Sequence, residues 1–598
     1  MKKLGILIFF AITAFSSSAA TDITVGGVSG HWTIAGSPYR IFNDIVVNSG
    51  DILTIDPGVQ IVFQGPYFLY IYGNIQASGS AAAHISFTVQ DTTGWYIDTG
   101  YVGGWRGMET IYPGLPTDTT FFNYCDMQYM KNGGFHMEKP ITMDHTNFSN
   151  NKINDNIGSL VDLNNYIPGT GTFEVTNCTF SHNIQSSWAL LMCWSDANIT
   201  NTIVHDNTLR RGVSACFLVY GNYIFKDNEI YNNGSTADSG IGNAIGASNT
   251  IALIEGNKIH DNVMYEQGAI GVSESIADIN HNYICNNRVL KPFTGAACGL
   301  VQGGGGVRVG DNPDSSNLQR KTTVRNNIIA NNYTGFAGAA VYIIFANVDV
   351  LNNQIINNNE GWKGDIYVFN NPGVGWYGTV NIQNNVLYKN APLADGDTIL
   401  VRVEAADTLV YANNWMQKSI ESNLHIGMFG IANWGDTSNN VIGTSPGMVA
   451  PTINANVTES ALTSDFSLLA SSPCIDKGDS LCAPLGAVDY AGYARISGTN
   501  VDIGAYEYQQ TIVVNAVGNI NASRIKAHPN PAHNLLFIST PDATGVMTLR
   551  DITGKVVIQE KVNSKLIYLD VQSIPRGLYI ATWSDENGIS ETQKIIVE

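Results

Sequence analysis

The chain has 598 residues, of which 14% are charged, and acidic residues outnumber basic ones enough to give a formal net charge of −19. Nucleic-acid binding depends on clustered Lys and Arg, so this composition argues against a nucleic-acid partner. The length is enough for one large core and a small additional domain, and the many Gly residues and aromatic side chains suit an exported globular protein.

The first predicted element is a secretory signal peptide at residues 1–20. Two lysines after the initiating Met precede an apolar run from Leu4 to Phe15, and small residues lead to an expected cleavage after Ala20. The apolar run is too short to cross a bilayer, and no later segment reaches that length. We therefore expect an exported mature chain without a membrane span.

Residues 21–140 alternate strand-like runs with Gly and Pro turns, as in Asp51–Phe63. A repeat protein exposes edge strands and a cut core at its first coil, and something atypical must cover them. This region is predicted to form an N-terminal cap and the first coils.

Residues 141–400 carry a repeat that decides the architecture. A phrase of Asn, a β-former and a closing Asn returns every 24 to 32 residues, with one step of 45 between Asn287 and Asn332. Each copy has a short strand with one inward apolar residue. Asn tolerates left-handed turns, and its amide can bond to an Asn in the next coil. The repeat predicts stacked coils of a parallel β-helix.

An outward stripe of ring side chains and one arginine is predicted on these coils. In four copies an apolar strand residue stands 15 residues before the closing Asn, which marks it as inward. Strand alternation then places the following residues outside: Phe217, Arg308, Tyr342, Tyr367 and Phe369. Aromatic rings and an arginine suit a sugar-binding groove, although stacked aromatics can also simply cover a sheet.

Two insertions, at residues 289–320 and 370–378, are predicted to wall that groove, because long loops of repeat proteins gather on the working face. Glycoside hydrolysis needs two opposed carboxylates, and Asp311 and Asp365 are the candidates near Arg308. An arginine is almost always protonated and makes a poor general base. Catalytic residues therefore stay unassigned.

Residues 401–510 are predicted to form the last coils and a capping module. The acidic residues at 476, 479, 502 and 507 lie in Gly-containing turns, so turn formation explains them better than a catalytic or Ca²⁺ cluster, and no cofactor or metal is assigned. Cys474 and Cys482 flank a short loop and are the candidate disulfide in an oxidising compartment. Cysteines within the repeats are expected to be buried thiols.

Residues 511–524 are predicted to be a linker, and residues 525–598 a small antiparallel β-sandwich of strands separated by Gly turns. Its recurring blocks are Pro-Asn-Pro, a Gly-Lys turn, Pro-x-Gly-Leu-Tyr and a basic-apolar end. Their positions are Pro529, Asn530, Pro531, Gly554, Lys555, Pro575, Gly577, Tyr579 and Lys594. These blocks strongly resemble the C-terminal sorting domain of the type IX secretion system. That resemblance implies type IX secretion machinery as a partner, and release or attachment at the cell surface.

The Asn repeats resemble the right-handed parallel β-helix superfamily of secreted bacterial proteins and polysaccharide-degrading enzymes. The phrases Ser471–Asp479 and Val501–Tyr508 resemble the C-terminal ends of such proteins from Bacteroidetes-type bacteria. The resemblance implies an all-β chain: a right-handed parallel β-helix followed by the small sandwich. It specifies the fold strongly and the activity weakly.

The expected function is a secreted or cell-surface protein that binds glycan or another surface through its solenoid face. A polysaccharide lyase or glycoside hydrolase acting in a groove near Arg308 is the alternative. A structural surface protein, whose outward face contacts copies of itself, is a third possibility.

Overall fold

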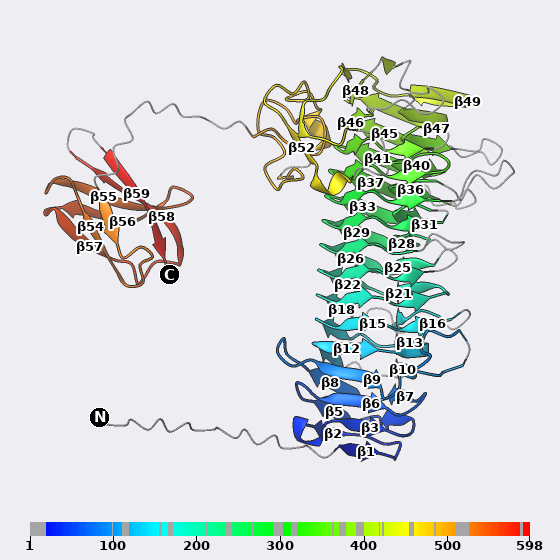
Figure 1. Ribbon diagram of the computed structural model, residues 1–598. Helices are drawn as coiled ribbons and strands as arrows, with labels where there is room; N and C mark the ends of the chain where they lie inside the picture. The colour runs from blue at the N-terminus through cyan, green and yellow to red at the C-terminus, as the bar shows by residue number, and fades with distance from the viewer. Residues whose placement is uncertain are drawn as a thin grey trace, which may run out of the picture. The chain divides into compact units, whose positions relative to one another are not determined.

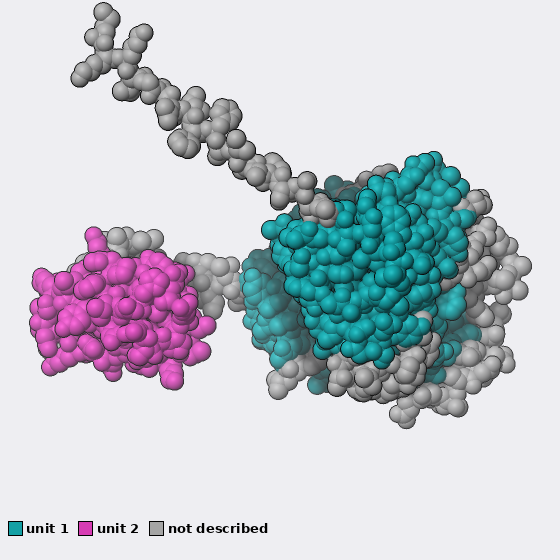
Figure 2. Space-filling view, turned by 90° about the horizontal axis from the view of Figure 1, so that it is seen from below, with its two compact units in different colours: residues 1–510 teal, residues 511–598 magenta. Residues whose placement is uncertain are grey.

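The computed structural model describes residues 20–98, 100–110, 119–154, 158–165, 171–209, 213–234, 242–265, 267–290, 303–311, 320–360, 364–369, 378–389, 400–417, 419–420, 424–453, 460–483, 486–509, 525–585 and 590–598. The chain divides into two compact units, residues 1–510 and 511–598 (Figure 2). The predicted signal peptide up to residue 19 and the predicted linker lie outside the described residues. Within the described part of the chain, no helix is long and apolar enough to cross a membrane.

The first unit is the predicted parallel β-helix, in which each coil passes through sheet 1, then sheet 2, then sheet 3 (Figure 1). Sheet 1 contains β4 (Ile45–Val47), β7 (Phe68–Ile71), β10 (Trp105–Thr110), β13 (Met130–Met137), β17 (Val161–Leu163), β21 (Ala189–Cys193), β25 (Ser214–Val219), β28 (Ile245–Ser248), β32 (Ile270–Ser273), β36 (Val307–Gly310), β40 (Val341–Ile344), β44 (Ile366–Phe369), β47 (Val401–Ala412) and β49 (Leu424–Trp434).

Sheet 2 follows sheet 1 in each coil and shares the long strands β47 and β49 with it. Its other strands are β2 (Gly30–Trp32), β5 (Ile52–Ile55), β8 (Asn74–Ser78), β11 (Phe121–Asn123), β14 (Thr142–Asp144), β18 (Phe173–Thr176), β22 (Ala197–Thr200), β26 (Asn222–Lys226), β29 (Ile251–Glu255), β33 (Ile276–Asn280), β37 (Lys321–Arg325), β41 (Asn347–Leu351) and β45 (Thr379–Gln383).

Sheet 3 closes each coil. It contains β1 (Thr21–Ile23), β3 (Tyr39–Ile41), β6 (Gln60–Phe63), β9 (Ile85–Val89), β12 (Cys125–Gln128), β15 (Asn147–Ser149), β19 (Thr179–Ser181), β23 (Ile203–His205), β27 (Glu229–Tyr231), β30 (Lys258–His260), β34 (Tyr283–Cys285), β38 (Ile328–Ala330), β42 (Gln354–Ile356), β46 (Val386–Tyr388), β48 (Trp415–Met416) and β50 (Val441–Ile442).

Short strands lie between sheets 3 and 1: β16 (Lys152–Ile153), β20 (Ile184–Gln185), β24 (Thr208–Leu209), β31 (Val263–Met264), β35 (Arg288–Val289), β39 (Tyr333–Thr334) and β43 (Asn359–Glu360). The parallel register stacks like residues along the solenoid axis. Ile254, Ile279, Val324, Val350 and Ile382 are partners on successive strands of sheet 2, and all are fully buried. Because each apolar residue packs on an equivalent one, the core continues from coil to coil.

Two asparagine ladders line the corners on either side of sheet 3. One ladder contains Asn228, Asn257, Asn282, Asn327, Asn353, Asn385, Asn414 and Asn440, linked Nδ2 to Oδ1 at 2.9–3.3 Å. The other contains Asn151, Asn183, Asn207, Asn233, Asn262, Asn287, Asn332 and Asn358, linked at 2.9–3.0 Å. The predicted bonding of Asn between coils is thus present at two corners.

The two consecutive Asn residues of the repeat have different structural roles at a corner. Asn232 has a left-handed backbone with φ of 52°, and the next residue, Asn233, enters the ladder. Asn286 and Asn287 repeat this arrangement with φ of 57° at the first position. Asn is among the few residues that adopt this conformation at low cost, so the first Asn makes the turn and the second ties it to the next coil.

A capping module, residues 445–509, returns to the outer face of sheet 3 over the last coils (Figure 1). Its described elements are β51 (Met448–Ala450), β52 (Asp465–Leu468) and two 3₁₀ turns at Ala461–Thr463 and Ser480–Cys482; a further 3₁₀ turn lies in the first coil at Ile34–Gly36. The module packs Phe466 and Leu468 against outward side chains of sheet 3. Those side chains are Cys285, Ile328, Ala330, Ile356, Val386, Tyr388 and Trp415.

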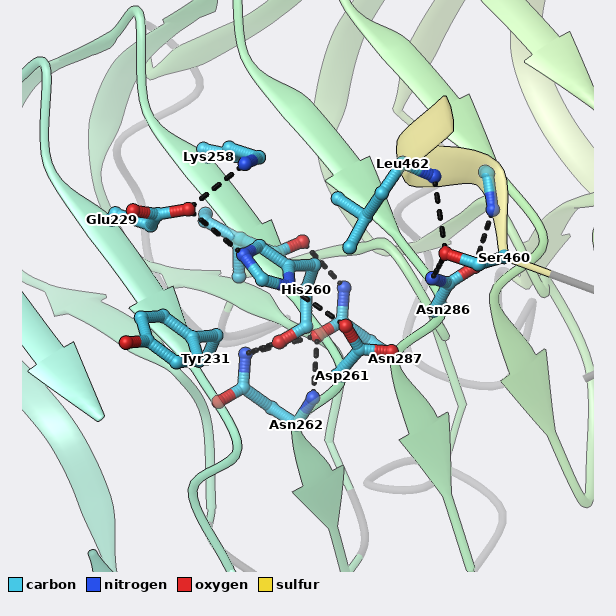
Figure 3. A network of polar contacts seen from close by, with 12 residues as sticks. Glu229, Tyr231, Lys258, His260, Asp261, Asn262, Asn286, Asn287, Ser460 and Leu462 are labelled. Carbon is cyan, nitrogen blue, oxygen red and sulfur yellow. Dashed lines mark hydrogen bonds and ion pairs between the residues drawn. The ribbon is translucent and has the colours of Figure 1, made fainter. Parts of the chain in front are cut away.

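Hydrogen bonds fix the edge of this module at β34 (Figure 3). The Tyr283 hydroxyl donates to the Ala461 carbonyl at 2.7 Å. Asn286 Nδ2 donates to Ser460 Oγ at 3.1 Å, and Asn286 Oδ1 accepts from the Ala461 amide at 3.1 Å. The left-handed Asn286 therefore serves both as a corner residue and as an anchor for the module.

One coil earlier, the outer face of sheet 3 is polar. His260 lies between Asp261 Oδ2 at 2.7 Å and Glu229 Oε1 at 3.1 Å (Figure 3). Its ring stacks on Tyr231 at 5.1 Å, and Tyr231 stacks on His205 at 5.0 Å. The change from this polar column to the apolar residues of the next coils marks where the capping module begins.

The second unit is the predicted antiparallel β-sandwich. One sheet contains β53 (Lys526–His528), β54 (Leu535–Ser539) and β57 (Leu566–Asp570), and the other β56 (Val556–Val562), β55 (Gly545–Asp551), β58 (Gly577–Ser584) and β59 (Ser590–Val597). Leu536, Met547 and Trp583 are among the side chains of its own buried core.

The expected disulfide between Cys474 and Cys482 is not formed. Both thiols are free, and burial raises the pKa of each to about 12. Cys474 Sγ lies 3.7 Å from the Pro446 carbonyl and Cys482 Sγ lies 3.7 Å from Gln383 Oε1, so the two side chains have separate surroundings. The predicted burial of the repeat cysteines holds for Cys178, Cys193, Cys216 and Cys285.

We expect both Cys474 and Cys482 to be alkylated when the secreted protein is unfolded in denaturant without a reductant, because neither is joined to the other. Peptide mass analysis after digestion gives the answer. A cross-linked pair of peptides containing these two cysteines would contradict the structure.

Candidate binding site

The outward side chains of sheet 1 form one row along the solenoid axis. The ladder register links, coil by coil, Tyr70, Glu109, His136, Asp162, Met192, Phe217, Gly246, Gly271, Arg308, Tyr342, Tyr367 and Arg402. We call this the outer row. It contains four of the five residues that the sequence placed in a binding stripe, and Phe369 follows Tyr367 two residues later on the same strand.

The Arg308 end of the outer row is closed to solvent. Tyr342 and Tyr367 are 0% and 2% exposed, and Arg308 is 7% exposed. The two tyrosine rings lie 5.4 Å apart, and Tyr367 stacks on Phe369 at 6.3 Å. Phe336 packs on both tyrosines from a preceding turn. These side chains point away from the solenoid core and are buried against one another.

Ion pairs hold the chain around this cluster. Arg402 Nε lies 2.6 Å from Glu404 Oε1, which also accepts a hydrogen bond from the Tyr367 hydroxyl at 3.3 Å. The two acidic candidates are paired elsewhere, Asp365 with Lys389 at 3.3 Å and Asp311 with Arg320 at 3.6 Å. Burial lowers the pKa of Arg308. Of the predicted groove walls at 289–320 and 370–378, residues 291–302, 312–319 and 370–377 lie outside the described residues.

Phe217 lies in a different setting, three coils away. It packs with Trp194 on a small cluster formed by Ala189, Met192 and Val219. A side chain at residue 246 of the next strand would come within 2.4 Å of the Phe217 ring, so Gly246 leaves the space that the ring occupies. Phe217 and Trp194 thus pack on the same cluster, and we call the aromatic side chains around it the aromatic patch.

The outer part of this aromatic patch consists of the exposed Trp188 and Tyr220 and the half-buried Trp194, at the two ends of β21 and after β25. Trp188 is 57% exposed and Tyr220 is 69% exposed. The Trp188 and Trp194 rings lie 5.8 Å apart, and Trp194 and Tyr220 lie 6.2 Å apart at an interplanar angle of 26°. Large aromatic side chains that stay this exposed leave apolar ring faces open to a ligand.

Two hollows flank Tyr220. The first, of about 390 Å³, is lined by Asn165, Gly171, Trp194, Ser195, Asp196, Tyr220 and Asn222. The second, of about 500 Å³, is lined by Tyr220, Gly221, Asn222, Asn249, Thr250, Ile251, Glu274, Ile276 and Arg320. Both combine apolar walls with amides, hydroxyls and carboxylates, a mixture suited to a polyhydroxylated ligand.

A half-buried carboxyl lies at the foot of the patch. Burial raises the pKa of Asp162, while the charge of the neighbouring His136 and a hydrogen bond from the Trp194 side chain act in the opposite direction. His136 Nε2 lies 3.1 Å from the Ser159 carbonyl. Asp162 thus forms a hydrogen bond with Trp194, which lines the first hollow.

Sequence reasoning found Phe217 but missed Trp188, Trp194 and Tyr220. The three lie in turns just outside the strands, where strand alternation makes no prediction. The available signal in the sequence was the presence of large aromatic side chains directly next to a short strand. Within the described residues, no group of three or more His, Cys, Asp or Glu side chains is arranged to hold a metal ion.

The predicted sorting residues meet at two places in the second unit. Asn530, between Pro529 and Pro531, donates from Nδ2 to the Lys594 carbonyl at 2.8 Å and accepts from the Ile596 amide at 2.8 Å. The Pro-Asn-Pro block is therefore tied to the final strand, which carries the basic-apolar end.

The other blocks are turns of the same sandwich. Gly554 has φ of 86° between β55 and β56, and the next amide, that of Lys555, donates to Asp551 Oδ1 at 3.0 Å. Gly577 begins β58, and the Tyr579 hydroxyl donates to the Pro575 carbonyl. Each block thus has a local structural role in the domain.

Comparison with known proteins identifies the second unit. Residues 526–598 match the family model described as the secretion system C-terminal sorting domain. No curated protein matches the chain. Among solved structures, a rhamnogalacturonan lyase is similar over 66% of this chain and 80% of its own, at 13% identity and a TM-score of 0.23. A likeness this weak carries no argument about activity. The sorting domain implies that the protein is secreted and interacts with the type IX secretion machinery.

Proposed function

We propose that this secreted protein binds a glycan chain through the aromatic patch on sheet 1, at the cell surface or in the medium. The single observation that carries the proposal is the exposure of Trp188 and Tyr220 on either side of Trp194, with polar hollows beside them. Sugar rings stack on aromatic faces by their C–H surfaces while their hydroxyls bond to amides and carboxylates.

Backbone conformation supports the proposal. Trp188 and Tyr220 have left-handed backbones, with φ of 53° and 61°. Asn249, at the turn one coil after Tyr220, has the same conformation and is a residue that adopts it easily. A bulky aromatic residue costs about 1 kcal/mol or more in this conformation, which favours a role for the side chain itself.

We expect the double variant Trp188→Ala/Trp194→Ala to lose glycan retention by at least about tenfold, since each truncation removes a stacking surface and tenfold corresponds to about 1.4 kcal/mol. Affinity electrophoresis of the full secreted chain through gels containing neutral and acidic polysaccharides measures the effect. Trp434→Ala is the matched control, because Trp434 is 53% exposed on β49, outside the patch.

The same assay distinguishes the other functions. Shortening of the polysaccharide that depends on Arg308 would replace binding by a lyase or hydrolase activity. The absence of both retention and shortening would favour a structural surface protein. Retention that survives the double variant would place the binding surface elsewhere.

A further inference from the structure

We infer that the two hollows select uncharged polysaccharides and reject polyuronates. The inference rests on the glycan binding proposed above and adds the chemical class of the ligand. It follows from the balance of charge around the hollows, which is set by Asp196 in the first and by Glu274 and Arg320 in the second.

Asp196 gives the first hollow a fixed negative charge. Its Oδ1 accepts hydrogen bonds from the Asn222 backbone amide at 2.7 Å and from Asn222 Nδ2 at 3.1 Å. These neutral donors orient the carboxylate without neutralising it. The other polar side chains among the described lining residues of this hollow are uncharged: Asn165, Ser195, Tyr220 and Asn222.

The one cation among the described lining residues, Arg320, is already engaged by acidic groups. Its Nη1 donates to the Glu274 carbonyl at 2.8 Å and lies 3.8 Å from Glu274 Oε2. Its Nη2 lies 3.6 Å from Asp311 Oδ1. The guanidinium is therefore shared between two carboxylates, and the second hollow has no excess positive charge to offer an acidic sugar.

A uronate in either hollow would meet these carboxylates at short range. Two like charges at this range repel, and the repulsion is stronger near a protein surface than in bulk water because the effective dielectric constant is lower there. A neutral sugar instead donates hydrogen bonds from its hydroxyl groups to the same carboxylates, and hydrogen bonds to charged acceptors are stronger than those to neutral ones. The net charge of −19 on the whole chain adds to the repulsion of a polyanion.

The test uses polysaccharide pairs that share a backbone and differ in charge. Hydroxyethyl cellulose is compared with carboxymethyl cellulose, and fully methyl-esterified homogalacturonan with its de-esterified form, at low ionic strength. For a backbone that is retained, we expect the neutral member to be held at least about tenfold more strongly, which corresponds to about 1.4 kcal/mol. Salt near 0.5 M should narrow the difference, because it screens the repulsion.

The variant Asp196→Asn/Glu274→Gln removes two negative charges and releases Arg320 from one partner. It should strengthen retention of the acidic member about tenfold, because the repulsion is removed, and weaken retention of the neutral member, because neutral acceptors replace charged ones. The preference for the neutral member should therefore be lost. Asp407→Asn/Asp436→Asn is the matched control, since both carboxylates are exposed and lie outside the hollows. Unchanged thermal unfolding shows that each variant is folded.

Failures of the two proposals have different signatures. Suppose that the acidic members are retained as strongly as the neutral ones or more strongly, and that Trp194→Ala abolishes this retention. That result would overturn the charge selection but support the binding patch. No retention in any pair would overturn the binding patch, and with it the selection.

Discussion

Replacing Asn282 by Ala should destabilise the solenoid by several kcal/mol. Its side chain makes four hydrogen bonds inside the ladder: Nδ2 donates to the Ile254 carbonyl at 2.8 Å and to Asn327 Oδ1 at 3.0 Å. Its Oδ1 accepts from the Asn257 amide and Asn257 Nδ2, both at 2.9 Å. Each buried polar group left without a partner costs about 1–3 kcal/mol, so we expect a loss of about 4 kcal/mol or more.

The loss is measured as the shift in the free energy of unfolding by urea, with Asn433→Ala as control. Asn433 is exposed and makes one side-chain bond of 3.4 Å to Asp407, so its variant should stay within about 0.5 kcal/mol of the wild type. A loss below about 1 kcal/mol for Asn282→Ala would mean that the ladder reflects the fold without stabilising it.

The variant Arg495→Met should open the capping module while leaving the coils folded. Arg495 is 2% exposed, its Nη2 donates to the Asp502 carbonyl at 3.0 Å, and its Nη1 lies 3.1 Å from Glu507 Oε1. Removing one partner of a buried ion pair typically costs about 3–5 kcal/mol. Alkylation of the native protein at Cys474, buried inside the module, reports the opening.

The stability that the capping module loses in Arg495→Met should increase with pH. Burial raises the pKa of Glu507, and the charge of Arg495 offsets part of that increase. A carboxyl whose pKa is raised on folding binds its proton more tightly in the folded state, so its contribution to stability falls as the pH rises above its unfolded pKa, near 4.3. In Arg495→Met, an ionised Glu507 is buried without the positive charge of Arg495. The loss of stability is therefore largest at alkaline pH, where Glu507 is ionised.

Comparing variants at the same pH removes the effect of thiol ionisation on labelling. Arg495→Met/Glu507→Leu should recover most of the stability lost in Arg495→Met, since paired removal leaves no buried charge from this pair. Equal labelling of Cys474 in the wild type and Arg495→Met at all pH values would show that the pair does not hold the module closed.

The stretch of sheet 3 that the module covers explains why opening has consequences beyond the module. Ile328, Ile356 and Val386 point outward from β38, β42 and β46 and are buried in a cluster that they share with the module. Detachment would expose them as one continuous apolar strip, and such strips promote association. We therefore expect Arg495→Met to aggregate at lower temperature than Asn282→Ala does.

The sequence by itself determined the coil. Repeats are local, and a closing Asn such as Asn233 or Asn262 specifies both its own corner and the corner of the next coil, because ladder partners are equivalent positions. Strand alternation is also a local pattern, so it separated inward-facing from outward-facing residues. It placed four residues on one row: Phe217, Arg308, Tyr342 and Tyr367.

Only the tertiary structure decided what covers the outward positions. Strand alternation predicts that the side chains of Tyr342 and Phe217 point out of the core. Whether such a side chain is exposed to solvent depends on segments that are distant in the chain. His281 bonds to the carbonyl of Asp489, 208 residues away, and Asn357 to Thr452, 95 residues away. Such contacts have no periodic signal in the sequence, whereas coil-to-coil contacts recur about every 25 residues. The solenoid was therefore predictable from the sequence. Which of its outward surfaces are exposed and which are covered was not.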